Sequence, residues 1–200
     1  LVHKRGQYMQ EAVPVGQGGM AAIIGLDDEA IAAACEKATK EAGEVQPVNF
    51  NCPGQTVIAG TTHGVEKAVE ELKAAGAKKA VVLPVSAPFH STLMKPAAEK
   101  LRVALADVAL AAPEIPVVNN VDVAVQQDAD AIREALYRQA FGPVRWVECV
   151  HALKGRGVTH IIECGPGKVL AGLTKRIDPE LVGAALFDSA TLAETRELLA

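Results

Sequence analysis

The sequence predicts an α/β fold in two parts, a compact βαββαβ subdomain inserted into a larger region. Over residues 18–85, short apolar runs and amphipathic helical patterns follow in the order strand, helix, strand, strand, helix, strand. Over residues 86–200, helical and strand-like stretches alternate, which predicts a mostly parallel sheet covered by helices. Half of the 200 residues are hydrophobic, so the chain can bury a core.

Local signals define the elements of residues 18–85. Asp27 precedes an acidic turn and predicts a helix N-cap, and Gly43 predicts the end of that helix. Pro53 and Gly54 suit a type II turn between two strands. We expect strands over 20–25, 45–50, 55–59 and 80–85, and helices over 28–42 and 62–75. This order is the ferredoxin-like arrangement.

Residues 1–17 and 86–200 belong to the larger part. The chain opens inside a helical pattern at Leu1 without an initiator methionine, and we interpret it as the carboxy-terminal part of a longer protein. Ser91 predicts the cap of a long helix that runs towards Ala112. The further expected elements are strands over 116–121, 159–164 and 181–186, and helices over 128–140, over 146–154, after Gly167 and from 191 onwards.

His90 lies at the turn between the two parts. Pro84 and Pro88 keep the preceding segment extended, so His90 is expected at the end of an extended stretch and at the mouth of a helix. Catalytic groups are often held at such positions, and histidine is the commonest acid–base residue. A hydrogen-bonded histidine with no chemical role is the more frequent alternative.

The composition argues against several classes of protein. Only seven residues are aromatic, the net charge is −4 and no long basic run is present, so a nucleic-acid-binding role is not expected. No apolar stretch reaches the roughly 20 residues that cross a membrane. The four cysteines form no CxxC pair and the five histidines form no HExxH motif, so reduced thiols without a metal site are expected, in a cytoplasmic protein.

Four further sites carry residues that suit more than one role or indicate little by themselves. Gly165-Pro166-Gly167-Lys168 follows a strand and opens a helix, and it suits either an anion site or a simple tight turn. Arg5 suits either a solvated helix position or the grip of a carboxylate. Asn119 and Asn120 end an apolar strand and need partners there. Gln139 lies near the end of a helix and by itself indicates little.

Several stretches, taken together, resemble the malonyl-CoA:acyl-carrier-protein transacylase family and the related acyltransferase domains of polyketide synthases. They cover nearly the whole chain in the family's order. These stretches are KRGQYMQEAVP, GGMAAIIGLDDEAI, VNFNCPGQTVIAG, LPVSAPFHSTLMKPA, PVVNNVD, YRQAFGPVRW and ECGPGKVLAGLTKRI. The resemblance implies an α/β-hydrolase-like core, incomplete in this chain, formed by residues 1–17 and 86–200, with residues 18–85 as the ferredoxin-like insertion.

The resemblance also implies a ping-pong acyl transfer from malonyl-CoA to the phosphopantetheine thiol of acyl carrier protein. By position, His90 is the general base and acid of a serine nucleophile. Arg5 holds the malonyl carboxylate, and the backbone carbonyl of Gln139 orients the imidazole. Malonyl-CoA is a substrate and no cofactor is implied. Acyl carrier protein is the implied partner, and we expect a monomer.

The chain departs from the complete family pattern at its beginning. No GxSxG motif occurs, and Ser86, Ser91 and Ser189 do not sit in such an elbow. The family's GQGSQ segment is also missing. We therefore expect the 200 residues alone to be inactive. Phe89 before His90 resembles the form of the motif that accompanies malonyl selectivity, because a ring fills the space that a methyl branch needs.

Two other functions suit the same residues. A non-catalytic module that docks an acidic carrier protein is one, because the chain has cations that could form a local basic surface. These cations are Lys95, Lys168, Lys175 and Arg176. A hydrolase that releases malonate is the other, since the implied fold serves both reactions.

Overall fold

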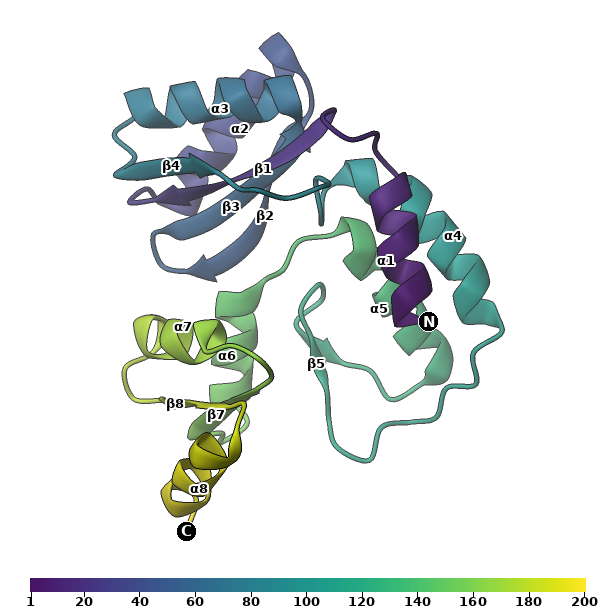
Figure 1. The fold of residues 1–200 in the computed structure, drawn as a ribbon, viewed down its shortest axis with the longest axis vertical. Helices are drawn as coiled ribbons and strands as arrows, with labels where there is room; N and C mark the ends of the chain where they lie inside the picture. Colours follow the sequence, from purple (N-terminus) through teal and green to yellow (C-terminus); the bar gives the residue numbers. More distant parts are fainter. The chain divides into compact units, whose positions relative to one another are not determined.

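The computed structural model describes residues 1–200 and divides the chain into two compact units, residues 1–146 and residues 147–200. The first contains helices α1 (Val2–Glu11), α2 (Asp28–Ala42), α3 (Thr62–Ala74), α4 (Lys95–Ala106) and α5 (Ala129–Phe141), the short 3-10 helix η1 (Thr92–Met94), and strands β1 (Gly18–Ile24), β2 (Val45–Cys52), β3 (Gln55–Thr61), β4 (Lys79–Val82), β5 (Val118–Asn119) and β6 (Ala124–Val125) (Figure 1).

Strands β1 to β4 form one antiparallel sheet in the order β2-β3-β1-β4. The element order predicted for residues 18–85 is therefore confirmed. The local signals act as expected: Asp27 Oδ1 accepts a hydrogen bond from Ala30 N at 2.7 Å and begins α2, and Gly43 ends it with a φ of 128°. Gly54, with a φ of 72°, supplies the positive φ that the turn between β2 and β3 requires.

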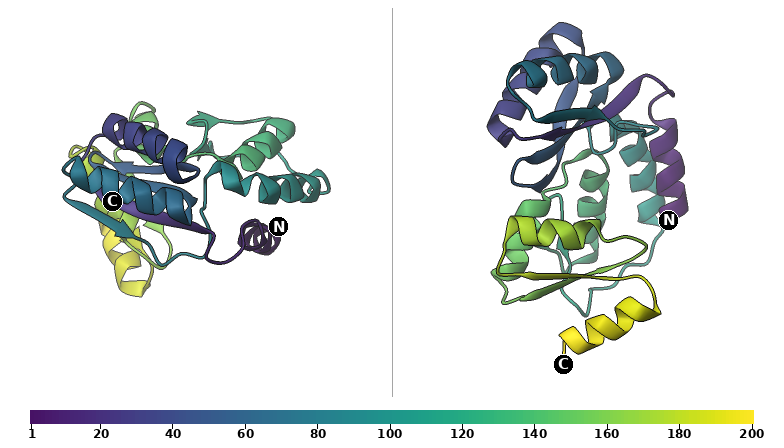
Figure 2. Two further views of the ribbon diagram at one scale, coloured as in Figure 1. Left: turned by 90° about the horizontal axis from the view of Figure 1, so that it is seen from above. Right: turned by 60° about the vertical axis from the view of Figure 1, so that its left-hand side comes forward.

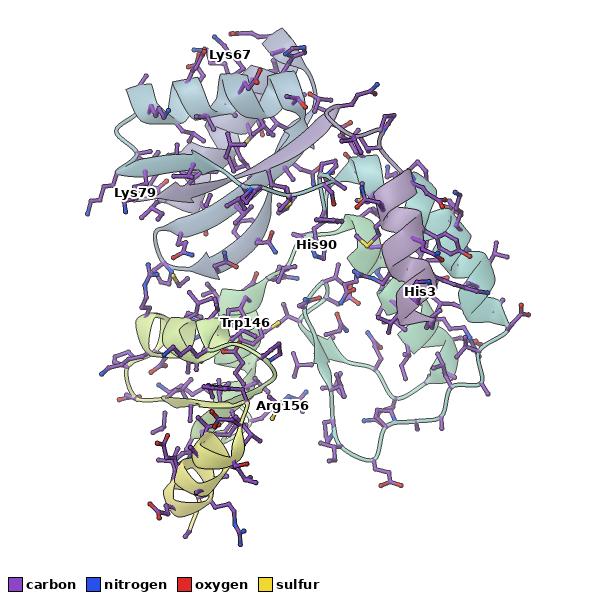
Figure 3. The ribbon with its side chains drawn as sticks, viewed as in Figure 1. His3, Lys67, Lys79, His90, Trp146 and Arg156 are labelled. Atoms are coloured by element: carbon purple, nitrogen blue, oxygen red, sulfur yellow. The ribbon has the colours of Figure 1, made fainter.

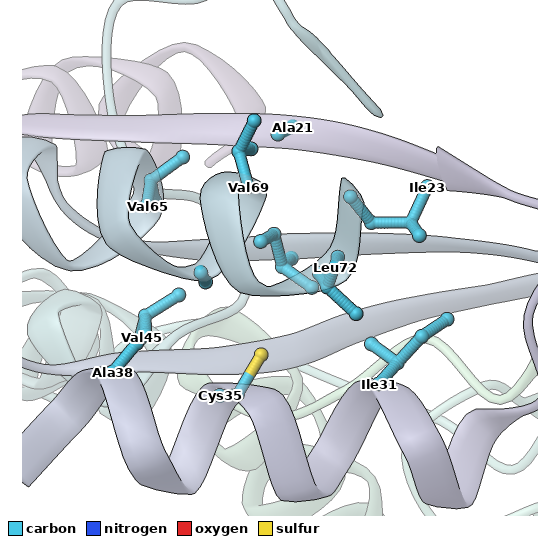
Figure 4. Packing of buried hydrophobic residues seen from close by; sticks show 11 residues of the cluster. Ala21, Ile23, Ile31, Cys35, Ala38, Val45, Val65, Val69 and Leu72 are labelled. Atoms are coloured by element: carbon cyan, nitrogen blue, oxygen red, sulfur yellow. The ribbon is translucent and has the colours of Figure 1, made fainter. Parts of the chain in front are cut away.

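Helices α2 and α3 both cover one face of this sheet (Figures 1 and 2). Their apolar faces meet the alternate inward residues of the strands in the main core of the molecule (Figure 4). This cluster contains Ala21, Ile23, Ile31, Cys35, Ala38, Val45, Ile58, Val65, Ala68, Val69 and Leu72. The opposite face of the sheet buries Met20, Val48, Val57 and Ala59 against Leu83 and Phe89. Both faces of the sheet are thus in use, and the second one leads to the segment that carries His90.

One close approach of the backbone requires glycine. A Cβ atom at Gly60 on β3 would collide with the carbonyl of Glu44 and would lie 2.6 Å from Val45 Cα. Its register partner on β1, Gly19, has open space at the same position. The start of β2 can therefore approach β3 this closely at Gly60 only because no side chain is present there.

The helices α1, α4 and α5 form the rest of the first unit. Helix α4 contacts both α1 and α5, and their shared apolar residues include Met9, Met94, Leu101 and Leu105. Helix α4 ends at Ala106, so its predicted extension to residue 112 was wrong. The cause is long-range: the Arg133 guanidinium on α5 donates to Leu105 O at 3.2 Å and to Val108 O at 2.8 Å, and so satisfies carbonyls at the end of α4.

Two other sequence-based expectations need correction. Ser91 makes no cap: its hydroxyl donates to Pro88 O at 2.7 Å, and Thr92 N instead donates to Gln46 Oε1 on β2 at 3.2 Å. The strand expected over 116–121 is a two-residue strand in a β5–β6 hairpin. Asn119 closes this hairpin, because its Oδ1 accepts from Asp122 N and its Nδ2 donates to Ala124 O.

The second unit contains α6 (Trp146–Lys154, whose first residue lies at the boundary), β7 (His160–Cys164), α7 (Val169–Ile177), β8 (Val182–Leu186) and α8 (Ser189–Leu198). Strands β7 and β8 pair in parallel, with His160 opposite Val182 and Cys164 opposite Leu186. The mostly parallel sheet expected over residues 86–200 is present as this pair only. No helix of the chain has the length and apolar character that a membrane span needs.

Candidate active site

A compact turn presents His90 at the edge of the sheet (Figure 3). Pro88 is buried against Gly18, where a Cβ atom would lie only 2.5 Å from Pro88 Cδ. The buried Ser91 hydroxyl closes the turn by donating to Pro88 O. Between these two contacts His90 has a φ of 62°, in the left-handed region that residues with a Cβ rarely adopt. The surrounding packing thus holds His90 in a backbone conformation that it would not choose alone.

The imidazole of His90 contacts the end of helix α5. Its Nδ1 lies 3.0 Å from the backbone oxygen of Gln139. The last carbonyls of a helix lack a donor within the helix, so this oxygen can accept a hydrogen bond from outside. Because a carbonyl can only accept, the proton must be on Nδ1, and the Nε2 lone pair then remains available.

The surroundings of His90 favour the neutral ring. Burial is the largest effect and lowers the pKa of the His90 imidazole, and the nearby Arg5 charge also lowers it. The hydrogen bonds to the backbone of Gln139 and of Gly142 raise this pKa. The net shift is downward from the usual value of 6.5. A histidine that is neutral at physiological pH can take a proton from a nearby hydroxyl or thiol.

Arg5 on α1 provides a cation beside this histidine. Its Nη2 donates to Gln139 Oε1 at 3.1 Å, so its hydrogen-bond partner is a neutral amide rather than a carboxylate. The residue is half-buried, and burial lowers the pKa of the guanidinium. A partly desolvated charge without a counter-charge favours the binding of an anion, and a guanidinium fits a carboxylate with two parallel hydrogen bonds.

Arg5 and His90 line the same cavity, which has a volume of about 470 Å³. Its other walls are mainly apolar and come from α1, the face of the sheet opposite α2 and α3, and the segment after β4. They include Met9, Met20, Val57, Leu83, Val85 and Phe89. Gly6 also lines the cavity, and the position of its missing Cβ has nothing within 4 Å. The cavity can therefore hold an apolar group that ends in an anion next to a neutral imidazole.

The structure brings together the three residues singled out in the sequence. Arg5, His90 and Gln139 come from α1, the turn after β4 and α5, and Arg5 and Gln139 are 134 residues apart in the chain. Apart from Phe89, sequence reasoning missed the apolar walls, and it missed the contacts of Gly18 and Ser91 that hold the turn. Met20 could have been found from the period-two pattern of β1, whereas nothing local in the sequence indicates that Pro88 packs on Gly18.

The other candidate sites are less suited to chemistry. The first turn of α7 after Gly165-Pro166-Gly167 already receives a carboxylate, because Ala171 N donates to Glu163 Oε2 at 2.9 Å. This contact favours the tight-turn interpretation. Burial raises the pKa of Cys35 to about 12, so this thiol is held in its unreactive form. No group of three or more His, Cys, Asp or Glu side chains is arranged to hold a metal ion.

Comparison with known proteins defines the class. The acyl transferase domain family matches residues 1–176, and the chain belongs to this family. It is 58% identical over 193 residues to the malonyl CoA-acyl carrier protein transacylase of Salmonella typhimurium, a match that covers 96% of the chain and 62% of that protein. The corresponding protein of Bacillus subtilis is 49% identical over 191 residues, with 96% of the chain and 60% of the relative covered. The chain thus spans less than two thirds of these relatives.

Solved structures give the same result. An acyl-carrier-protein S-malonyltransferase from Burkholderia pseudomallei matches with a TM-score of 0.95 and 62% identity, over 98% of this chain and 64% of that one. A malonyl-transacylase in complex with a type II polyketide synthase acyl-carrier protein matches with a TM-score of 0.96 and 53% identity, over 98% and 63% of the two chains.

Proposed function

We propose that the chain carries the histidine and the anion-binding part of an acyltransferase that moves malonyl from malonyl-CoA to the phosphopantetheine thiol of acyl carrier protein. One observation carries this proposal: Arg5, half-buried and bound to a neutral amide, shares a cavity with a His90 that is held by a main-chain carbonyl. The relatives' malonyl-transacylase names and the complex of one of them with a carrier protein support the choice of acyl group and partner.

In this proposal, residues 1–17 and 86–200 belong to an α/β-hydrolase-like core and residues 18–85 are a ferredoxin-like insertion. The strand order β2-β3-β1-β4 supports the second assignment, and the parallel β7–β8 pair supports the first. The enzyme acts in the cytoplasm as a monomer and needs no cofactor besides its substrates.

The proposed mechanism has two half-reactions that use the same imidazole. His90 Nε2 takes the proton of a serine hydroxyl as this oxygen attacks the malonyl thioester, and then protonates the departing CoA sulfur. The carrier-protein thiol next gives its proton to Nε2 and attacks the malonyl-serine ester, and the imidazolium returns the proton to the serine oxygen. Throughout, Gln139 O holds the imidazole and Arg5 pairs with the malonyl carboxylate.

The serine of this mechanism is not within the 200 residues, which contain no GxSxG motif. We therefore expect the chain alone to transfer nothing, and the complete protein to be acylated on a serine upstream of Leu1. Phe89 forms part of the cavity wall, and we propose that its ring takes the space that a branch on the acyl group would need.

Intact mass spectrometry of the complete protein tests this function. Incubation with malonyl-CoA should add one malonyl group, which acyl carrier protein then removes. The Arg5→Ala variant should lose acylation by malonyl-CoA but retain acylation by acetyl-CoA, because only malonyl carries the carboxylate. Equal loss of acylation with both donors would show that Arg5 does not bind the malonyl carboxylate. Accumulation of free malonate would indicate a hydrolase, and carrier binding without any acyl adduct would indicate a docking module.

A further inference from the structure

The side chain of Gln139 is held at both ends. Its Oε1 accepts a hydrogen bond from Arg5 Nη2 at 3.1 Å, and its Nε2 donates to Asn120 Oδ1 at 3.2 Å. A guanidinium has donors only, so Arg5 needs the oxygen end of the amide. The amide group can turn over and exchange its two ends unless another contact distinguishes them. In this structure Arg5 selects the oxygen end, and Asn120 reinforces the same orientation because its Oδ1 accepts from the nitrogen end.

Asn120 is placed by contacts that do not involve Arg5. Its own backbone oxygen accepts from Arg145 N at 2.9 Å. The adjacent hairpin turn is joined to α5 by an ion pair between Asp122 and Arg138, with Arg138 Nη2 at 2.6 Å from Asp122 Oδ2. Arg138 immediately precedes Gln139 on the helix. The hairpin therefore presents Asn120 to the Gln139 amide from a fixed frame.

Gln139 also contacts His90, but through its main chain rather than its side chain. The Gln139 backbone oxygen receives Nδ1 of His90, whereas the Gln139 side chain receives Arg5. A change at Asn120 should turn the side-chain amide without moving the helix carbonyl. The two functional groups of the cavity are therefore separable at this point.

We propose that Asn120 is a positioning residue that orients the Arg5 guanidinium through the side-chain amide of Gln139. Its effect is on the recognition of a carboxylate-bearing acyl group, and it touches neither the substrate nor the histidine. This inference rests on the proposed function for its consequence in catalysis, but the orientation of Arg5 is a property of the unliganded protein and can be measured independently.

The kinetic test uses the complete protein with malonyl-CoA and acetyl-CoA as alternative donors. Asn120→Leu keeps the γ-branched shape of the side chain and removes the acceptor. We expect kcat/KM for malonyl-CoA to fall about tenfold, mainly through KM, since a charge-assisted contact of the substrate is weakened. The value for acetyl-CoA should change less than about twofold, and the pH profile should be unaltered because the His90 contact is made by the main chain.

The matched control is the neighbouring asparagine. Asn119→Leu removes the hydrogen bonds that close the β5–β6 hairpin and tests whether loosening this hairpin is sufficient. If Asn119→Leu reproduces the malonyl-specific loss, or if Asn120→Leu affects both donors equally, the positioning role of Asn120 is wrong. A malonyl-specific loss that is clearly smaller in Asn119→Leu than in Asn120→Leu supports the proposal.

A second measurement does not depend on acyl transfer. With 15N-labelled arginine in the complete protein, NMR exchange spectroscopy reports how fast the Arg5 guanidinium rotates. Loss of its aligned acceptor in Asn120→Leu should speed this rotation about tenfold, as expected for one lost hydrogen bond. Asn120→Asp keeps an acceptor of the same shape and should leave the rate near the wild-type value. An unchanged rate in Asn120→Leu would overturn the proposal, whereas absence of malonyl transfer by the wild type would overturn the proposed function alone.

Discussion

Residues 18–82 and residues 86–145 belong to the same compact unit but are held together in different ways. The first region is the four-stranded sheet with α2 and α3, which encloses one cluster of eleven buried residues. The second region contains the turn of His90, α4, the β5–β6 hairpin and α5. No residue between positions 106 and 134 of this region is buried. Individual polar contacts, such as those of Asn119, Asp122 and Arg133, position this stretch instead.

This difference indicates which substitutions should lower stability and which should reorient side chains. Apolar burial is strong but not directional, so changes in the sheet region alter the free energy of unfolding. Hydrogen bonds are individually weak in net terms but strongly directional, so changes around residues 106–134 reorient groups with little loss of stability. Substitutions in the two regions should therefore separate into those that unfold the chain and those that misplace the site.

The largest expected effect is the loss of a core leucine from the sheet region. Leu72 on α3 is completely buried in the main cluster, so Leu72→Ala should lower the free energy of unfolding by about 3 kcal/mol. The matched change Leu110→Ala removes a half-buried side chain from the other region and should cost less than about 1 kcal/mol. Urea denaturation of both variants measures the difference, and similar costs would show that the two regions are held alike.

A smaller loss is expected from a single added methyl group. Gly60→Ala places a Cβ atom against the Glu44 carbonyl and should cost about 2 kcal/mol. Gly19→Ala, at the register partner, places the same atom in open space and should change stability by less than about 0.5 kcal/mol. Thermal unfolding of the pair isolates the close backbone approach, and equal shifts in Tm would contradict it.

Gly6→Ala should have a modest effect of opposite sign on stability. Gly6 is inside α1, and alanine there should stabilise the helix by about 0.5–1 kcal/mol, because no atom lies within 4 Å of the new methyl group. The methyl group occupies part of the cavity, so malonyl transfer by the complete protein should fall although Tm rises. A rise in both quantities would show that this part of the cavity is not used by the acyl group.

The smallest expected effect is on the pH dependence of stability. The pKa of His90 is lowered by folding, mainly through burial, so the unfolded chain binds this proton more readily than the folded one. The contribution of His90 to the free energy of unfolding should accordingly be largest above pH 6.5 and decrease as the pH falls from 6.5 through the lowered pKa. His90→Asn, which tolerates the positive φ, should show a shallower decrease between pH 7 and 5 in denaturant titrations. Identical slopes would mean that His90 is not desolvated.

The sequence predicted the sheet region well because its signals are local. Asp27, Gly43 and the Pro53-Gly54 pair each specify the geometry of their own few residues, and they act as expected in the structure. The predictions for the end of α4 and for the role of Ser91 were wrong because long-range contacts decide both features. Arg133 satisfies the end of α4 from 28 residues away, and Gln46 takes the place of the Ser91 cap from 46 residues away.

The site was predictable in its members but not in its connections. His90 was visible as a histidine at a proline-rich turn, and Arg5 and Gln139 were identified through the family resemblance. The contact between Arg5 and the Gln139 side chain depends on how α1 and α5 both pack against α4, which no local pattern reports. The Asn119-Asn120 pair carried an available signal: asparagines favour turns, and this preference explains why the expected strand became a hairpin.

The main-chain contact between Gln139 and His90 has a consequence for the history of such a protein. Every amino acid carries a backbone carbonyl, so any replacement at position 139 that keeps the helix preserves the partner of the imidazole. The side chain at the same position faces Arg5 and can vary independently. A lineage could thus change its acyl preference by single substitutions at position 139 and never pass through an intermediate with a misoriented histidine.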